Sequence, residues 1–325
     1  MGSNLSRYHK LIESEISRQK FGKTPSSLYE PIRYLMGLGG KRLRPMLTLL
    51  SYSLFKNDVK SVVKYAAAVE AFHNFTLMHD DIMDKAPLRR GKPTVHEKWN
   101  VSTAILSGDV MLVKVYDMLL SIDPKKLRRV YSAFNKCAAE VCEGQQWDME
   151  FESKSSVSEE EYLEMIKLKT AVLLGFSLEF GAILAGASDK DCKALREFGT
   201  NIGIGFQLKD DLLDAYGDPQ KFGKQVGGDI VANKKTFLLI KALELAEGDA
   251  KNELEKWLLS KEFKNEEKVS AVTRIYDALG VHALADKKID GYFKKGFAKL
   301  NALSCSPKKA QDLREFAEAL IERQS

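Results

Sequence analysis

The stretch "LMHDDIMDKAPLRRG", residues 77–91, places three aspartates in a segment that otherwise has the apolar spacing of a buried helix. Asp80 and Asp84 are four residues apart and therefore share one face of a helix, whereas Asp81 is rotated from Asp80 by about 100°. Carboxylates one turn apart repel each other unless a cation separates them. The stretch therefore predicts a helix whose end carries a cation site, with a pair of arginines shortly after it.

Other segments predict further long helices. Apolar residues recur at three- and four-residue spacing through residues 65–84, which indicates a helix with a buried face. A capping box, S-x-x-E, opens a second helix over residues 158–186. A third is predicted over residues 191–217, and the last begins at Pro307, in the first turn where proline is favoured.

Composition favours one all-α domain that spans residues 1–325. Only 8 prolines in 325 residues, with no β alternation of useful length and no linker, suit long uninterrupted helices. The lysine-rich segment "KEFKNEEKVS", residues 261–270, is interpreted as a solvated connection between helices. No apolar run is expected to reach membrane-spanning length, so no transmembrane segment is predicted.

Charge and cysteine content limit the class of partner and the compartment. The net charge of +5 is a small difference between 50 basic and 45 acidic residues, and no basic tract with aromatics indicates a nucleic-acid partner. The four cysteines form no C-x-x-C pair and lack the spacing of a zinc site; they are Cys137, Cys142, Cys192 and Cys305. Free thiols are typical of reducing compartments, so a cytoplasmic location is expected.

A second D-D-x-x-D motif lies in "QLKDDLLDAYGD", as Asp210, Asp211 and Asp214. Oxygen-only ligands suit Mg²⁺, which usually binds one or two carboxylates together with substrate phosphates. One such motif would be weak evidence, because aspartate-rich helix surfaces are common and solvated. Two motifs in long apolar helices favour magnesium sites that bind a polyphosphate.

Basic residues near these motifs are candidates for binding that polyphosphate. The segment "GLGGKRLRPML" places three of them at the start of a helix, where backbone N–H groups also favour anions. A lysine within an apolar helix is unusual without a role. The candidates are Lys41, Arg42 and Arg44; Arg89 and Arg90; Lys169, next to Thr170; and Lys224 and Lys234.

On these residues the chain resembles the trans-isoprenyl diphosphate synthases, the family that includes farnesyl and geranylgeranyl diphosphate synthases. The resemblance rests on "GGKRLRP", "HDDIMDKAPLRRGKPTVH", "GQQWD", Lys169–Thr170, "GFQLKDDLLD" and "GKQVGGDI". It implies an all-α isoprenoid synthase bundle of roughly 10–13 helices around a deep central cavity. It also implies a homodimer and three Mg²⁺ ions per active site.

The resemblance implies a role for each matching residue. Magnesium would be held by Asp80, Asp81, Asp84, Asp210, Asp211 and Asp214. The allylic diphosphate would be bound by Arg89, Lys169, Lys224, Lys234 and Gln145. Isopentenyl diphosphate would be bound by Lys41, Arg44, His73 and Arg90. The reaction centre would be formed by Lys169, Thr170, Gln207 and Asp210, with Gln145 and Asp148 beside them.

Two departures from the family pattern follow the second motif. The usual Gly-Lys-x-Thr is Asn233-Lys234-Lys235-Thr236 here, so Lys234 matches but its turn is expected to differ. The proline that often follows that threonine is absent. Neither departure involves a predicted metal ligand.

The implied chemistry is ionisation of the allylic diphosphate, attack by the isopentenyl double bond and loss of a proton, in a cavity that excludes water. Product length in the family depends on residues about one turn before the first aspartate. Phe75 lies about 7 Å deeper than Asp80 along the helix, and Thr76 about 6 Å deeper. An aromatic residue followed by a small one resembles short-chain enzymes. The C20 product geranylgeranyl diphosphate is favoured, with the C15 product farnesyl diphosphate as the alternative.

Three other classes of protein are considered. A terpene cyclase would carry an N/D-x-x-S/T-x-x-x-E metal motif in place of the second D-D-x-x-D. A non-catalytic partner subunit would be expected to lose aspartates, whereas both motifs are intact here. A helical scaffold without metal would gain no thermal stability from magnesium and a bisphosphonate.

Overall fold

The structure is a computed structural model that describes residues 3–217 and 226–322, and almost all of its regular structure is α-helical. In chain order, the first half contains α1 (Ser3–Arg18), α2 (Ser26–Gly37), α3 (Leu43–Ser53), η1 (Val59–Val62), α4 (Val63–Met83), β1 (Leu88–Arg89), β2 (Lys92–Pro93), α5 (Val95–Lys98), α6 (Val101–Leu119) and α7 (Pro124–Ser153). The second half contains α8 (Glu159–Ile166), η2 (Lys167–Ala171), α9 (Val172–Ala185), α10 (Asp189–Tyr216), α12 (Gly228–Val231), α13 (Phe237–Leu245), α14 (Gly248–Leu259), α15 (Asn265–Ala278), α16 (Val281–Asn301) and α17 (Pro307–Ile321). The all-α prediction is confirmed.

The chain forms two compact units. Unit 1 consists of Met1–Asn135, Phe176–Arg196 and Leu303–Arg314, and unit 2 of Lys136–Gly175, Glu197–Ala302 and Glu315–Ser325. The boundaries fall within α7, α9, α10 and α17, so each of these helices contributes residues to both units. The single-domain interpretation of residues 1–325 stays a prediction, as does the central cavity.

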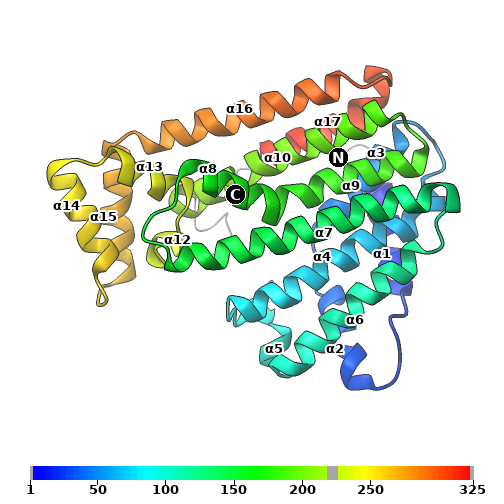
Figure 1. Ribbon diagram of the computed structural model, residues 1–325, viewed down its shortest axis with the longest axis horizontal. Helices are drawn as coiled ribbons and strands as arrows, with labels where there is room; N and C mark the ends of the chain where they lie inside the picture. Colours follow the sequence, from blue (N-terminus) through cyan, green and yellow to red (C-terminus); the bar gives the residue numbers. More distant parts are fainter. Residues whose placement is uncertain (1–2, 218–225, 323–325) are drawn as a thin grey trace. The chain divides into compact units, whose positions relative to one another are not determined.

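Unit 1 is built around α4, which packs beside α6 and also contacts α1, α2 and α3 (Figure 1). Its sequence is apolar around most of the circumference, as expected for a helix surrounded by others. Phe72, which is fully buried, contacts the rings of Phe75 and Phe134 at centroid distances of 5.7 and 5.0 Å. These aromatic contacts form the part of the core that lies on the N-terminal side of the first aspartate motif along α4.

Unit 2 contains α12 to α16, with α15 in contact with α12, α13, α14 and α16. The solvated connection predicted for residues 261–270 is confirmed for residues 261–264 only and is wrong for the rest, because α15 already begins at Asn265. Lys268, within that segment, is 0% exposed. Its neighbours Glu266 and Glu267 are exposed, so the charged run covers one helix turn whose fourth residue points inward.

The helix predicted over residues 158–186 is present, but it has an internal change of geometry. The capping box between Ser158 and Glu161 is confirmed, and α8 is followed by a π turn, η2, before α9. The stretch Glu159–Ala185 is long and apolar enough to cross a membrane, contrary to the sequence expectation. However, 83% of its apolar window is buried within the protein, and a core helix passes the same test.

A buried ion-pair cluster fixes the turn before α3. Arg42 has a left-handed backbone, and its guanidinium donates to Glu13 at 2.7 Å, to Glu70 at 2.8 Å and to the Met36 carbonyl at 2.9 Å. Burial alone would lower the pKa of Arg42, but the hydrogen bonds with Glu13 and Glu70 and the negative charges of both glutamates together raise it. The sequence had grouped Arg42 with the anion-binding residues. The structure instead places it inside the protein.

We expect the substitution Arg42→Met to lower the free energy of unfolding by about 3–5 kcal/mol, because the buried carboxylate of Glu70 would lose its cation. Denaturant unfolding monitored by circular dichroism measures this loss. The control is Arg128→Met, at an exposed arginine of α7, which should change stability by less than about 0.5 kcal/mol. Equal, small effects in both variants would contradict a structural role for Arg42.

Candidate active site

The first aspartate motif lies at the end of α4, in unit 1. Asp84 caps the helix, and its N–H donates to the Asp80 carbonyl at 2.9 Å, so the two residues are one helical turn apart as predicted. The Asp84 side chain is exposed and that of Asp80 is partly exposed. Asp81 is only 1% exposed. The motif therefore presents its outer two carboxylates and buries the middle one.

The middle carboxylate is held by an arginine from a short hairpin. Arg89, on β1, donates from Nε to both oxygens of Asp81 at 2.9 Å, and its Nη2 lies 2.7 Å from Asp81 Oδ1. Burial alone would lower the pKa of Arg89, but the hydrogen bond to Asp81 and the negative charges of the three motif aspartates together raise it. Arg89 Nη2 also lies 3.5 Å from Asp80 Oδ2. Arg89 thus connects the buried carboxylate to an outer one.

The sequence "RRG" forms the turn of this hairpin. Arg89 pairs with Lys92 across the two strands, which leaves Arg90 and Gly91 as a two-residue connection. Both have positive φ, 53° and 72°, as a type I′ turn requires. The turn therefore directs two adjacent arginines to different places, Arg89 to the aspartate motif and Arg90 to the glycine-rich loop before α3.

The second arginine reaches the glycine-rich loop before α3. Arg90 Nη1 donates to the Gly39 carbonyl, and its guanidinium lies against Gly40. A Cβ at Gly40 would come within 2.9 Å of Arg90 Nη2, and Gly40 also has a φ of 139°. Only glycine allows this close approach without a shift. The segments "GGKRLRP" and "RRG" are therefore in contact.

A cationic patch surrounds His73 on α4. Burial, and then the positive charges of Arg44, Arg90, Arg89 and Arg42, hold the pKa of His73 well below its usual range. His73 is therefore neutral at physiological pH and can act as a hydrogen-bond donor without adding charge. Three of the four residues predicted to bind isopentenyl diphosphate, Arg44, His73 and Arg90, are thus near one another. The fourth, Lys41, is exposed on the same loop.

The second aspartate motif lies near the end of α10, in unit 2, and repeats this design. Asp211 is 6% exposed, whereas Asp210 and Asp214 are partly exposed. Asp211 accepts a hydrogen bond from the Tyr162 hydroxyl and one from Gln207 Nε2 at 3.0 Å. Burial and the negative charge of a neighbouring aspartate, Asp229, raise the pKa of Asp211 to about 7, against opposing contributions from nearby donors and cations.

Gln207 links this motif to the π turn. Its Oε1 lies 3.5 Å from the hydroxyl of Thr170, which belongs to η2. On the same turn, Lys169 Nζ pairs with Asp148 of α7 at 2.5 Å. The structure therefore brings Thr170 and Gln207 together, and Lys169 with Asp148.

Two glycines allow neighbouring helices to pack on the π turn. A Cβ at Gly144 of α7 would lie 2.1 Å from the backbone nitrogen of Lys169. A Cβ at Gly203 of α10 would lie 2.7 Å from Cα and Cβ of Ala171. Because these contacts involve backbone atoms, no side-chain movement could relieve them. Glycine at both positions lets η2 pack closely between α7 and α10 within unit 2.

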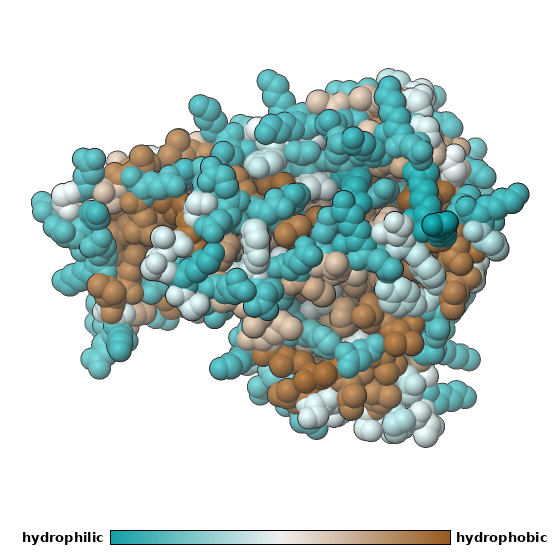
Figure 2. All heavy atoms as spheres, in the orientation of Figure 1, coloured by the Kyte–Doolittle hydropathy of each residue, from teal (hydrophilic) through white to brown (hydrophobic). Residues whose placement is uncertain are grey.

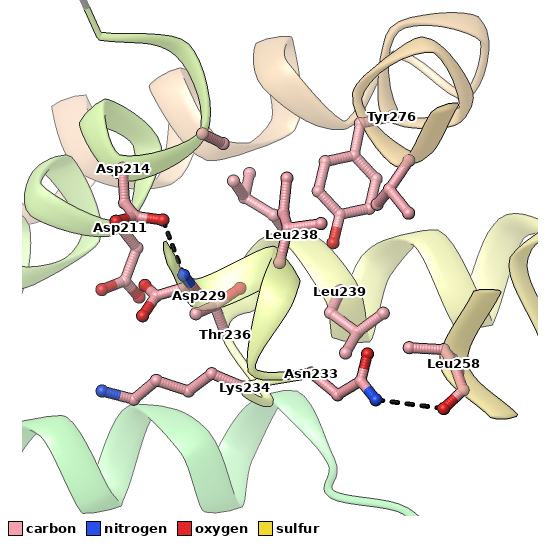
Figure 3. A pocket seen from close by; sticks show the side chains of 13 residues that line it. Asp211, Asp214, Asp229, Asn233, Lys234, Thr236, Leu238, Leu239, Leu258 and Tyr276 are labelled. Carbon is pink, nitrogen blue, oxygen red and sulfur yellow. Dashed lines mark hydrogen bonds between the residues drawn. The ribbon is translucent and has the colours of Figure 1, made fainter. Parts of the chain in front are cut away.

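A pocket in unit 2 lies beside the second motif (Figure 3). Asp211 and Asp214 enter it from α10, Asp229 from α12, and Lys234 from the turn that follows. The N–H of Asp229 donates to Asp214 Oδ2 at 2.9 Å. The side chain of Lys234 extends beneath the carboxylates of Asp211 and Asp229 in Figure 3. Lys234 therefore lies next to the aspartate motif, as predicted.

Gln145 and Lys224 complete the predicted set for the allylic diphosphate. Gln145 Nε2, on α7, is a buried donor with no hydrogen-bond partner in the part of the chain that the structure describes. Such a donor is available to an oxygen of a ligand. Lys224 lies outside the described residues.

The predicted chain-length residues both lie on α4. The Phe75 ring packs edge-to-face on the His79 ring, with 4.9 Å between ring centroids, and also contacts Phe72. Phe75 is therefore closer than Phe72 to the first aspartate motif along α4. The hydroxyl of Thr76 donates to the His73 carbonyl at 2.8 Å, within its own helix. Both side chains are partly exposed, and neither is locked in the core.

The donor set fits magnesium that arrives with a phosphate ligand. Within residues 3–217 and 226–322, no three or more acidic, histidine or cysteine side chains form a ready-made metal site. Each motif offers two partly or fully exposed carboxylates, and all the donors are oxygens. Mg²⁺ characteristically binds one or two carboxylates and completes its coordination with water and phosphate oxygens.

Two residues of this site received no role from the sequence. Tyr162, 49 positions before Asp211 in the chain, is a fully buried tyrosine whose pKa is raised well above the usual value by burial and by Asp211. Its only sequence signal is its place between the capping box and Lys169. Asp229 lies in the matched segment "GKQVGGDI", which could have identified it as a further acidic residue of the site.

Comparisons with known proteins agree with these features. A family model described as Polyprenyl synthetase matches residues 25–276. A short chain isoprenyl diphosphate synthase of Methanocaldococcus jannaschii is 45% identical over 246 residues, which cover 75% of each chain. A geranylgeranyl diphosphate synthase of Methanosarcina mazei is 38% identical over 302 residues, covering 92% of this chain and 91% of that protein. The crystal structure of geranylgeranyl pyrophosphate synthetase from Pyrococcus horikoshii Ot3 matches with a TM-score of 0.91 at 37% sequence identity. The match covers 99% of this chain and 98% of that one.

The substitution Tyr162→Phe should weaken the binding of Mg²⁺ with inorganic diphosphate by roughly 10–100-fold, because Asp211 would lose a donor that orients the motif. Isothermal titration calorimetry measures this affinity. The control is Tyr292→Phe, at a partly exposed tyrosine of α16, which should leave the affinity unchanged. Wild-type affinity in Tyr162→Phe would show that the hydroxyl does not orient the motif.

Proposed function

The chain belongs to the polyprenyl synthetase family, and we propose that it is a trans-prenyltransferase that joins isopentenyl diphosphate to an allylic diphosphate. The main product is geranylgeranyl diphosphate, and the allylic substrate is dimethylallyl, geranyl or farnesyl diphosphate. The observation that carries the proposal is the design common to both aspartate motifs. In each one, the outer carboxylates remain accessible and the middle one is anchored by the protein.

The aspartates of the two motifs would hold three Mg²⁺ ions, and these ions would bind the allylic diphosphate. When bound, the magnesium neutralises the diphosphate and the charge that builds on it as a leaving group. The protein supplies further positive charge and donors from Arg89, Lys169, Lys224, Lys234 and Gln145. The unpartnered amide of Gln145 and the position of Lys234 beside Asp211 support this assignment.

Isopentenyl diphosphate binds at the cationic patch of unit 1. Arg44 and Arg90 contact its phosphates, and neutral His73 donates a hydrogen bond. Lys41 adds charge from the exposed loop. The pKa of His73 is lowered by burial and then by the positive charges of nearby arginines, and those charges support this site because a diphosphate would neutralise them.

The reaction proceeds in three steps. The bond between the allylic carbon and the diphosphate oxygen breaks, and the electron pair leaves with the diphosphate. The double bond of isopentenyl diphosphate then forms the new carbon–carbon bond, and the departing diphosphate takes the proton that is lost. Lys169, Thr170 and Gln207 surround the ionising group, where fixed charges and dipoles stabilise the transition state. No side-chain nucleophile takes part.

Phe75 limits the length of the product. It lies five residues before Asp80, about 7 Å along α4, and it belongs to the aromatic cluster with Phe72. Thr76 is small enough for the growing chain to pass. The relatives named as geranylgeranyl diphosphate synthases support a C20 product.

The enzyme acts in the cytoplasm as a homodimer. All four cysteines lie among the described residues and are thiols rather than disulfides, which suits a reducing compartment. Leu106, Val113 and Leu120 recur every seven residues along α6 and its C-cap, and each is 58% exposed. Figure 2 displays apolar surface over the part of unit 1 where Figure 1 labels α5 and α6. A second copy of the chain would bury this apolar stripe.

Product analysis tests the proposed activity. Purified protein with Mg²⁺, isopentenyl diphosphate and each allylic substrate should yield mainly a C20 chain. Asp80→Ala and Asp210→Ala should each lower turnover by roughly 10²–10³-fold or more, while the fold stays intact. The control is Asp290→Ala, at an exposed aspartate of α16. Near-normal turnover in either motif variant would refute the metal assignment, and a C15 product would place the floor above Phe75.

Sedimentation velocity tests the dimer. The wild-type chain of 36.5 kDa should sediment as a dimer at micromolar concentration. Val113→Lys should dissociate it, because a charge in the apolar stripe would be buried without a partner. Leu259→Lys, at an isolated leucine of α14 that is 81% exposed, should leave the dimer unchanged. A monomeric wild type would contradict the proposal.

A further inference from the structure

Lys268 on α15 is a fully buried lysine with specific hydrogen bonds. Its Nζ donates to the Val231 carbonyl at 3.1 Å and to Asn233 Oδ1 at 2.6 Å, and it lies 4.3 Å from the centroid of the Phe263 ring. Burial lowers the pKa of Lys268. A lysine is rarely placed inside a protein without a role, because its desolvation costs free energy. Both of its hydrogen-bond acceptors belong to the end of α12 and the turn after it.

That turn ends α12 in a defined geometry. Asn233 has a φ of 53°, a left-handed conformation that glycine usually supplies and asparagine tolerates. The N–H of Asn233 donates to the Ile230 carbonyl at 3.2 Å, and that of Lys234 donates to the Asp229 carbonyl at 2.9 Å. These two hydrogen bonds form a Schellman motif. Lys234 and Asp229 are therefore tied to each other through the backbone.

The side chain of Asn233 also forms two hydrogen bonds to neighbouring elements. Its Oδ1 accepts from Lys268, and its Nδ2 donates to the Leu258 carbonyl at 3.0 Å. The side chain thus cross-links the turn to α15 on one side and to the end of α14 on the other. Glycine, the family's usual residue here, could form the turn but neither cross-link.

α12 and the cross-linked turn after it carry two charged groups of the pocket, Asp229 and Lys234. Figure 3 places the side chains of Asn233 and Lys234 on opposite sides of the turn, toward Leu258 and toward the aspartates respectively. The N–H of Asp229 also donates to Asp214 Oδ2. A shift of the turn would therefore move Lys234 and strain the contact with the second motif at the same time.

We propose that Lys268 and Asn233 are positioning residues that hold α12 and its turn, and with them Asp229 and Lys234, in register with the second aspartate motif for the allylic diphosphate. This inference rests on the proposed function. Neither residue touches the substrate. Displacements of about 1 Å at a positioning group can cost around 100-fold in rate, so a fixed turn has a direct effect on catalysis.

The experiment compares steady-state kinetics of wild type, Lys268→Met and Asn233→Gly. Methionine keeps the volume of Lys268 but leaves two acceptors without their donor, and glycine keeps the left-handed turn without the cross-links. We expect kcat/KM for the allylic substrate to fall roughly 10–100-fold in each, with KM for isopentenyl diphosphate within about twofold of wild type. Lys264→Met, on an exposed lysine one turn earlier, should match wild type.

The outcomes separate a positioning role from a merely structural one. Allylic kinetics within about twofold of wild type in either folded variant would overturn the inference, as would equal KM changes for both substrates. If Lys268→Met does not fold, Asn233→Gly decides the question.

Failure of the proposed function is distinguishable from failure of this inference. A wild type without turnover would contradict the function. The thermal shift caused by Mg²⁺ with inorganic diphosphate would then test the turn by itself. A shift retained in Asn233→Gly would overturn the positioning role, and a shift present only in wild type and Lys264→Met would support it.

Discussion

The repulsion between closely spaced carboxylates is the constraint on which both aspartate motifs depend. A helix that displays two aspartates one turn apart is electrostatically strained until a metal and a phosphate arrive. In each motif the protein responds by burying the middle aspartate and tying it down. Asp81 is held by Arg89, and Asp211 by Tyr162 and Gln207. The outer carboxylates can then remain accessible on a helix end whose position is already set.

Buried cations perform a related task in the turns that carry residues proposed to bind substrate. Arg42 fixes the loop before α3 through Glu13, Glu70 and a backbone carbonyl, next to exposed Lys41. Lys268 fixes the turn after α12. In both cases the charged group lies inside the protein, and a neighbouring residue on the turn supplies the charge to the site. The hydrogen bonds of each buried cation offset the cost of its desolvation and fix the turn on which another cation lies.

Helical periodicity and residue chemistry were enough to predict much of this protein. The apolar spacing around residues 65–84, the capping box at Ser158 and the scarcity of proline predicted the long helices, because these signals are local. The two D-D-x-x-D motifs predicted magnesium and a polyphosphate, because carboxylate spacing on a helix follows directly from 3.6 residues per turn. The resemblance then supplied roles for the cations. The charged run at residues 261–270 led to a wrong prediction for the residues that belong to α15, because composition does not reveal which turn of a helix faces inward.

Tertiary structure alone determined which polar side chains are accessible to a ligand and which are buried and hold a motif or a turn in place. Sequence placed Arg42 among the anion-binding residues, gave Tyr162 no role and treated Lys268 as solvated, whereas all three are buried and hold a motif or turn in place. It also could not indicate that Gly144 allows α7 to pack against the π turn. The reason is physical: local sequence determines conformation and chemical type within a few residues. Burial, and the partner that offsets its cost, depend on residues far apart in the chain.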